Sequence, residues 1–219
     1  NLPKLIENLE ILIGPKTNIV IENHYLGSIF KDSQFDTFYH EHQRTYSYRS
    51  FQFVARSLEM NVMRAEFVSR YGGNIRVYLG RGSESQMDVD EDGFISLFEG
   101  MKDDLDTWRL ESRAMIEDLV NANGPLNAKA FPGRAAILIK LLGLGCDEIS
   151  AVYEIEGSMK VGNYVPGTRI PILPERDLYL KNKTRPILNL AWHIPEEVRA
   201  NLRSHGYTGD VFDIKTKSK

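Results

Sequence analysis

The chain of 219 residues carries 27 lysines and arginines against 30 aspartates and glutamates, so its formal net charge is −3. This balance argues against a general nucleic-acid binder, which normally carries a basic excess, and no apolar run approaches the roughly 20 residues that span a bilayer. The single cysteine, Cys146, excludes an internal disulfide framework and a cysteine-built zinc site. We therefore expect a cytoplasmic protein with neither nucleic-acid nor membrane partners.

The first predicted elements are a helix and a strand. Residues 2–13 place leucine and isoleucine at mostly helical spacing, and Gly14-Pro15 ends the pattern. Residues 17–22 then read as a buried strand. This succession of helix, turn and strand is typical of a βαβ crossover entered halfway.

The middle of the chain predicts helix, hairpin and helix. Residues 46–60 have helical apolar spacing, and the β-rich runs 62–69 and 74–80 predict a hairpin. Its turn contains Gly72-Gly73, which lacks the lysine and following helix of a phosphate loop. An acidic segment (82–93) separates the hairpin from a long helical pattern over about 95–120.

The last part of the chain alternates strands and helices, which predicts a second, parallel α/β unit. The strands are expected at 126–131, 151–155, 186–191 and 210–214, with helices through residue 144 and over 195–204. The Lys-rich end (Lys215, Lys217 and Lys219) reads as a disordered tail.

The pattern with the most chemistry is Tyr39-His40-Glu41-His42, which follows closely on the first predicted strand. Ligand sites of parallel sheets lie beyond the carboxyl ends of strands, and an imidazole beside a carboxylate is suited to proton transfer near neutral pH. In an extended chain His40 and His42 would share one face and Tyr39 and Glu41 the other. An ordinary polar loop, or two of the ligands of a metal site, are the alternatives.

Several segments resemble the sugar C-methyltransferase family that branches deoxysugars. They are Phe35 to His42, Tyr46-Ser47, Gly72-Gly73-Asn74-Ile75-Arg76-Val77-Tyr78, residues 164–172 and Leu190-Ala191-Trp192. Their order and spacing extend the resemblance over roughly residues 1–214. We commit to no metal site, because His40 and His42 would supply only two ligands.

The resemblance implies an α/β fold in three parts. Residues 1–85 would form the C-terminal half of a class I methyltransferase Rossmann-like sheet, and residues 86–123 an acidic linker and long helix. Residues 124–219 would form a second Rossmann-like α/β domain. The match begins inside the methyltransferase fold, after the half that holds S-adenosylmethionine. We expect a monomer or a weak dimer.

The resemblance also implies a reaction, namely S-adenosylmethionine-dependent methylation of a carbon in a dTDP-linked keto-sugar by way of an enolate. Matched by position, Tyr39, Glu41 and His42 line the sugar site. His42 is expected to be the base and Glu41 to orient it, while Tyr39 hydrogen-bonds the enolate oxygen. His40 is expected to be structural.

In the second unit, family members carry a lysine after the first strand, where this chain has Arg134. At a helix N-terminus Arg134 would bind substrate phosphate. Glu154 ends a predicted strand where dinucleotide folds place a ribose-binding acid. Trp192 would either pack or line a cleft, and no partner is evident for His24 or His205.

Two other functions remain open. The chain could be a non-catalytic sugar-nucleotide-binding module that lacks the cofactor half. It could also be a calcium-dependent structural domain, because residues 88–99 fit the loop pattern D-x-D-x-D-G-x5-E. The alternative for this acidic segment is a linker whose aspartates cap the long helix.

Overall fold

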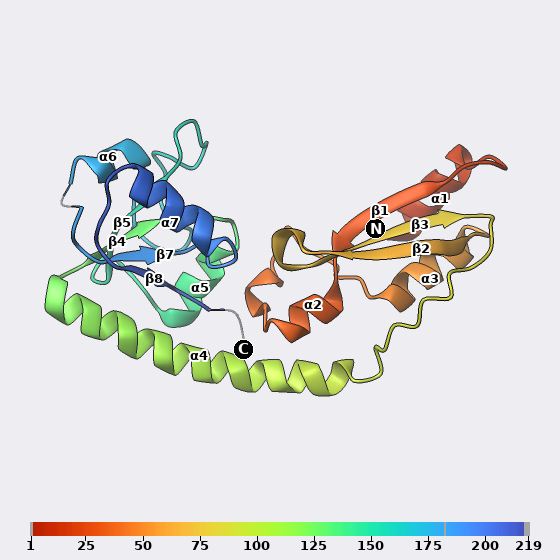
Figure 1. Cartoon of the computed structure of the whole chain (residues 1–219), viewed down its shortest axis with the longest axis horizontal. Helices are drawn as coiled ribbons and strands as arrows, with labels where there is room; N and C mark the ends of the chain where they lie inside the picture. The colour runs from red at the N-terminus through yellow and green to blue at the C-terminus, as the bar shows by residue number, and fades with distance from the viewer. Residues whose placement is uncertain (1, 182, 217–219) are drawn as a thin grey trace. The chain divides into compact units, whose positions relative to one another are not determined.

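The chain forms two compact units in a computed structural model that describes residues 2–181 and 183–216, apart from the side chain of Tyr71. The units are Asn1–Met101 and Lys102–Lys219, and the long helix α4 (Phe94–Asn123) belongs partly to each (Figure 1). Within the described part of the chain, no helix is long and apolar enough to cross a membrane.

The first unit is built around a three-stranded sheet with the order β1-β3-β2, in which β3 is antiparallel to both neighbours. This confirms the predicted first helix, first strand, second helix and hairpin, whereas α2 and the 3-10 turns η1 and η2 were not predicted. The prediction that the first strand is buried is wrong, because only His24 of β1 is buried. The elements are α1 (Leu2–Leu12), β1 (Ile19–His24), α2 (Leu26–Lys31), η1 (Phe35–Thr37), α3 (Tyr48–Ser57), β2 (Asn61–Val68), η2 (Arg70–Gly72) and β3 (Asn74–Gly80).

The two faces of this sheet differ because successive side chains of a strand point to opposite sides. Ile75, Val77 and Leu79 of β3 are fully buried, and they share one core with apolar residues of α1 and α3. On the other face Arg76 lies opposite both Glu22 and Glu66. Hydrogen bonds from Asn74 and then Arg76 lower the pKa of the Glu22 carboxyl.

The second unit contains a five-stranded, all-parallel sheet with the order β6-β5-β4-β7-β8. This confirms the predicted parallel α/β unit, although β6 and α6 were not predicted. The elements are β4 (Leu126–Lys129), α5 (Ala135–Leu142), β5 (Ile149–Glu154), β6 (Ile172–Pro174), α6 (Glu175–Tyr179), β7 (Ile187–Asn189), α7 (Pro195–Ser204) and β8 (Val211–Asp213). The protein is therefore α/β, with one parallel and one small antiparallel sheet.

The strand order of the parallel sheet reverses between two neighbours. From β4 the chain proceeds through β5 to β6 on one side, and it then returns to β7 and β8 on the other. The carboxyl ends of β4 and β7 thus flank a topological switch point, the usual position of a ligand in an open α/β sheet. The loop that follows β4 leads to Arg134, and the one that follows β7 leads to Trp192.

Lys215, the first lysine of the predicted disordered tail, is ordered and buried. Lys215 is only 4% exposed, and its ammonium nitrogen lies 4.1 Å from the centre of the Trp192 ring. The prediction is therefore wrong for Lys215, because a cation over an indole face gains electrostatic attraction as well as burial of its alkyl chain. Lys217 and Lys219 lie outside the described residues.

Candidate functional site

The chemically rich segment is a tight turn rather than the extended chain that the sequence suggested. The backbone N–H of His42 donates to the carbonyl of Tyr39 at 2.9 Å, which folds residues 39–42 back on themselves. The prediction of two opposite faces is therefore wrong. The Tyr39 ring centre lies 5.2 Å from that of His42 and 5.4 Å from that of His40.

Within this turn the phenol and the carboxylate form a pair. The Tyr39 hydroxyl donates to Glu41 Oε2 at 2.6 Å. Glu41 thus orients Tyr39, which differs from the expected role of orienting His42. Glu41 and His42 are exposed and Tyr39 is half-buried, so the turn presents a phenol, a carboxylate and an imidazole to solvent.

The segment that precedes the turn contains four buried polar residues, Ser33, Gln34, Asp36 and Thr37. The Gln34 amide donates to the carbonyls of Gly72 at 2.7 Å and Ser28 at 3.2 Å. These bonds join the segment before the turn to the β2–β3 hairpin and to α2. Buried residues with such hydrogen bonds can hold an exposed turn in one position.

The Gly72-Gly73 pair lies in the turn between β2 and β3, which confirms the prediction of a hairpin turn. The two glycines allow this turn to pack closely against the segment that contains Gln34. Gly72 has φ +94°, and a Cβ atom there would lie 2.5 Å from Gln34 Oε1. Gly73 has φ +112°, and a Cβ atom there would lie 2.4 Å from Ser28 Oγ. Both positions therefore require glycine for conformation and for space.

His24 belongs to the same neighbourhood, although the sequence suggested no partner for it. It is the last residue of β1 and is 8% exposed, and its Nδ1 lies 3.1 Å from the hydroxyl oxygen of Thr37. Its ring centre is 6.2 Å from that of His42 in an edge-to-face arrangement. The available signal was its place at the end of the strand that precedes the chemical motif in the chain.

A carboxylate of the acidic segment binds the N-terminus of α3. Glu91, only 6% exposed, accepts hydrogen bonds from the Tyr25 hydroxyl at 3.0 Å and from the backbone N–H groups of Tyr48 at 2.6 Å and Arg49 at 3.1 Å. Burial, reinforced by the Glu91 charge, raises the pKa of Tyr25. Asp92 pairs with Arg49 at 2.5 Å.

These contacts give Glu91 and Asp92 partners on α3, and Asp90 accepts from the backbone N–H of Asp92, so the predicted capping of the long helix by aspartates stays a prediction. They also give no support to the calcium-dependent domain. In the residues that the structure describes, no three Asp, Glu, His or Cys side chains converge in a way that could hold a metal ion.

In the second unit, Arg134 lies at the switch point. It precedes α5 and is 9% exposed, and its guanidinium carbon lies 4.9 Å from the Trp192 ring centre. With Lys215 over the same ring, two cations gather beside the carboxyl ends of β4 and β7. This position suits an anionic ligand, so phosphate binding by Arg134 stays a prediction.

The other sequence candidates of this unit make internal contacts. Glu154, 8% exposed, accepts hydrogen bonds from the N–H groups of Phe131 at 2.7 Å and Ile155 at 3.0 Å. Its carboxylate therefore fixes the loop that precedes α5, which leaves the ribose role without support. Trp192 is 2% exposed and packs, and the exposed His205 stacks on Tyr179 at 4.1 Å.

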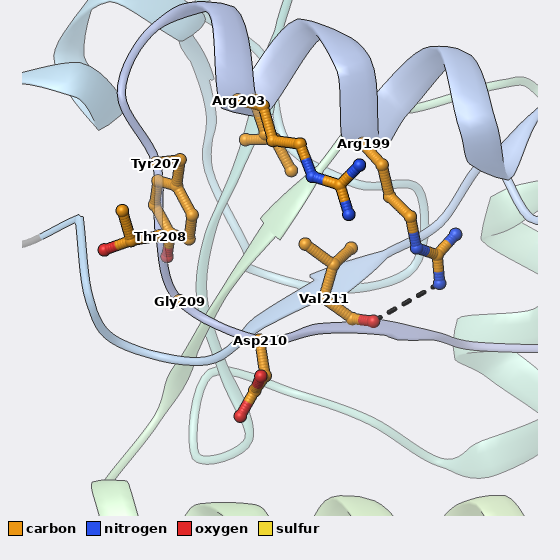
Figure 2. A pocket seen from close by; sticks show the side chains of 8 residues that line it. Arg199, Arg203, Tyr207, Thr208, Gly209, Asp210 and Val211 are labelled. Carbon is orange, nitrogen blue, oxygen red and sulfur yellow. Dashed lines mark hydrogen bonds between the residues drawn. The ribbon is translucent and has the colours of Figure 1, made fainter.

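A pocket of about 410 Å³ lies between α7 and β8 and contains none of the predicted residues. Figure 2 shows Arg199 and Arg203 extending from α7 toward Val211, with Arg199 bonded to the Val211 carbonyl at 3.4 Å. Arg199 also pairs with Asp213 at 2.7 Å. The sequence offered no motif for this pocket, because its lining comes from a helix face and an unpatterned loop.

The five-stranded parallel sheet and the small antiparallel sheet define an α/β protein, which is consistent with the C-terminal domain of a methyltransferase. Residues 69–212 match the C-methyltransferase C-terminal domain family, and the chain belongs to that family. It is also 24% identical over 233 residues to C-methyltransferase NovU of Streptomyces niveus. That match covers 98% of the chain and 53% of NovU, so the chain spans about half the length of this relative.

Proposed function

We propose that this chain supplies the sugar-site half of an S-adenosylmethionine-dependent C-methyltransferase that acts on a dTDP-linked keto-sugar. The observation that carries the proposal is the turn that follows β1 and η1. It gathers Tyr39, Glu41 and His42 within hydrogen-bonding and ring-contact distance at the surface. Family membership supports methyl transfer, and the resemblance to sugar-modifying members supplies the substrate class.

In the proposed reaction the His42 imidazole removes a proton from the carbon next to the sugar ketone. The electrons of the broken C–H bond form the enolate, whose carbon then accepts the methyl group. S-adenosylmethionine supplies that methyl group when it is bound. The Tyr39 hydroxyl has one proton, which it now donates to Glu41 at 2.6 Å, so Tyr39 must turn from Glu41 to the enolate oxygen as negative charge develops there.

The described residues of the first unit do not fit S-adenosylmethionine as its main binding half. The strand β1 passes into α2 through Tyr25, whose hydroxyl donates to Glu91 and whose ring occupies the space beside Gly27. This junction offers no glycine-rich turn to cradle a cofactor. The proposal therefore assigns the cofactor contacts to sequence outside these 219 residues.

The test of the proposal is hydrogen–deuterium exchange on the substrate, which needs the base but not the methyl donor. The chain is incubated with a dTDP-linked keto-deoxysugar in D₂O, and deuterium at the carbon next to the ketone is followed by NMR. We expect exchange above the buffer rate, with a loss of about 10²-fold or more in His42→Asn. The matched control is His40→Asn, which should retain exchange.

The second candidate, a non-catalytic sugar-nucleotide-binding module, predicts a different result in the same experiment. Binding of the dTDP-sugar would then be measurable by calorimetry while the deuterium content stayed at the buffer level. The switch-point cations Arg134 and Lys215 are what favour this candidate, because they could bind phosphate without any chemistry. Heat no different from that of buffer would contradict both candidates.

A further inference from the structure

The buried imidazole of His24 lies beside the exposed turn that carries His42. It closes β1, where its neighbour across the ladder is Asn74 of β3. It reaches Thr37 through Nδ1 at 3.1 Å and faces the His42 ring edge-on at 6.2 Å. His24 thus joins three parts of the molecule, namely the sheet, the 3-10 turn η1 and the turn that carries His42.

We propose that His24 is a positioning residue for His42, and that its ring, anchored by Thr37, forms the wall that fixes the orientation of the His42 imidazole. This inference rests on the proposed function for its chemical meaning, because the proposed role of His42 is proton removal. The geometric claim, in contrast, can be tested without any substrate.

The first argument is the contrast in burial between the two histidines. His42 is exposed, so solvent imposes no single orientation on its ring, and that ring faces those of Tyr39 and His24. The Tyr39 ring lies on the same turn and would move with it. His24 belongs to a strand whose partner β3 is largely buried, so it provides a fixed reference.

The second argument is the link through Thr37, whose side chain is 1% exposed. Thr37 ends η1, and its backbone carbonyl accepts from the N–H of Tyr39 at 3.1 Å. A hydrogen bond between Thr37 and His24 therefore holds the residue from which the turn departs. Loss of Thr37 or His24 would free the start of the turn to move, and it would also weaken the ring contact that orients His42.

Glu22 and Arg76, two charged residues of the sheet that carries His24, bind each other. Glu22, two residues earlier on the same face, accepts from Asn74 at 2.9 Å and from Arg76 at 2.6 Å. The Asn74 amide, opposite His24, is thereby directed toward Glu22. The role proposed for His24 is therefore steric orientation, and it requires no change in protonation.

The direct test is NMR on the 219-residue chain, with nuclear Overhauser contacts between the ring protons of His42 and Tyr39 as the signature. In His24→Leu and Thr37→Val these contacts should weaken at least twofold, and amide exchange should accelerate over residues 38–42. His24→Asn, whose amide can occupy the Nδ1 position, should restore the protection of those amides but not the ring contacts. His205→Asn is the matched histidine control and should change neither signal.

The inference is wrong if a folded His24→Leu chain keeps both the ring contacts and the amide protection of the original. In the deuterium-exchange assay, His24→Leu should lower the rate by about 10- to 100-fold, as expected for a displacement of about 1 Å, with little change in the affinity for the dTDP-sugar. If no variant or parent catalyses exchange, the proposed function fails while the NMR result still decides the role of His24.

Discussion

The two units place their polar residues in opposite ways. In the first unit the phenol, carboxylate and imidazole of the turn face solvent, while the residues that support them are buried. In the second unit Arg134 and Glu154 are themselves almost buried and contact their own loops or an indole. The difference shows that a residue type typical of ligand sites becomes informative only when its hydrogen bonds are known, because internal contacts can account for it fully.

The largest expected effect comes from removing a buried hydrogen-bond acceptor of the first unit. Glu91→Ala takes away the acceptor for Tyr25, Tyr48 and Arg49 and leaves two N–H groups at the start of α3 without it. We expect a loss of about 3 kcal/mol in unfolding free energy, measured by urea denaturation. Asp92→Ala removes only an exposed pair and should cost less than about 1 kcal/mol.

A smaller effect is expected from glycine substitutions, which compare the two units directly. Gly72→Ala combines a positive φ with a Cβ atom 2.5 Å from Gln34, and it should cost about 2–3 kcal/mol. Gly167→Ala in the second unit has φ +75° but nothing within 4 Å of its Cβ atom. It should cost about 1 kcal/mol. Equal losses in thermal denaturation would contradict the importance of the Gln34 contact.

The position of Arg134 tests whether the second unit binds anything at all. Arg134→Ala should weaken dTDP binding by about 10-fold in calorimetry, because the substitution removes a cation from the switch point. Arg203→Ala, in the pocket beside β8, is the matched control and should leave the affinity unchanged. A loss of stability without a loss of affinity would show that the Arg134–Trp192 stack is purely structural.

The smallest predicted effect is a change in the unfolding free energy at alkaline pH, and it tests the contribution of Tyr25. Its pKa in the folded chain is raised above the ordinary value of 10 by burial and by Glu91. Above pH 10 the unfolded state loses the Tyr25 proton, whereas the folded state keeps it. The unfolding free energy is therefore unaffected by ionisation of Tyr25 below pH 10 and declines as the pH rises further. Tyr25→Phe should show a smaller decline between pH 9 and pH 11 in urea titrations.

Local patterns were sufficient to predict much of the fold. The apolar spacing of α3 and the glycine turn between β2 and β3 are determined by neighbouring residues, so a short window of sequence contains the necessary information. The parallel sheet followed from the alternation of strands and helices. In contrast, β6 has three residues and α6 has five, which is too short for any period to emerge.

The candidate site was predicted only in composition. The sequence identified Tyr39, Glu41 and His42, but their mutual geometry depends on a turn that an extended-chain argument could not reproduce. The contribution of His24 depends on a hydrogen bond to Thr37, thirteen residues away. Glu91 meets its backbone partners across more than forty residues. Such long-range pairings are decided by packing, and no periodicity of the sequence encodes them.

Glu91 also determines how the acidic segment can vary during evolution. Of the carboxylates in residues 88–92, only that of Glu91 is buried, while Asp88, Asp90 and Asp92 are exposed. Substitutions at these three positions should accumulate almost neutrally, provided that the chain stays soluble. Position 91 should resist even replacement by aspartate, whose shorter side chain would not span the distance to both Tyr25 and the α3 amides. Selection would thus preserve one residue within a segment that otherwise drifts.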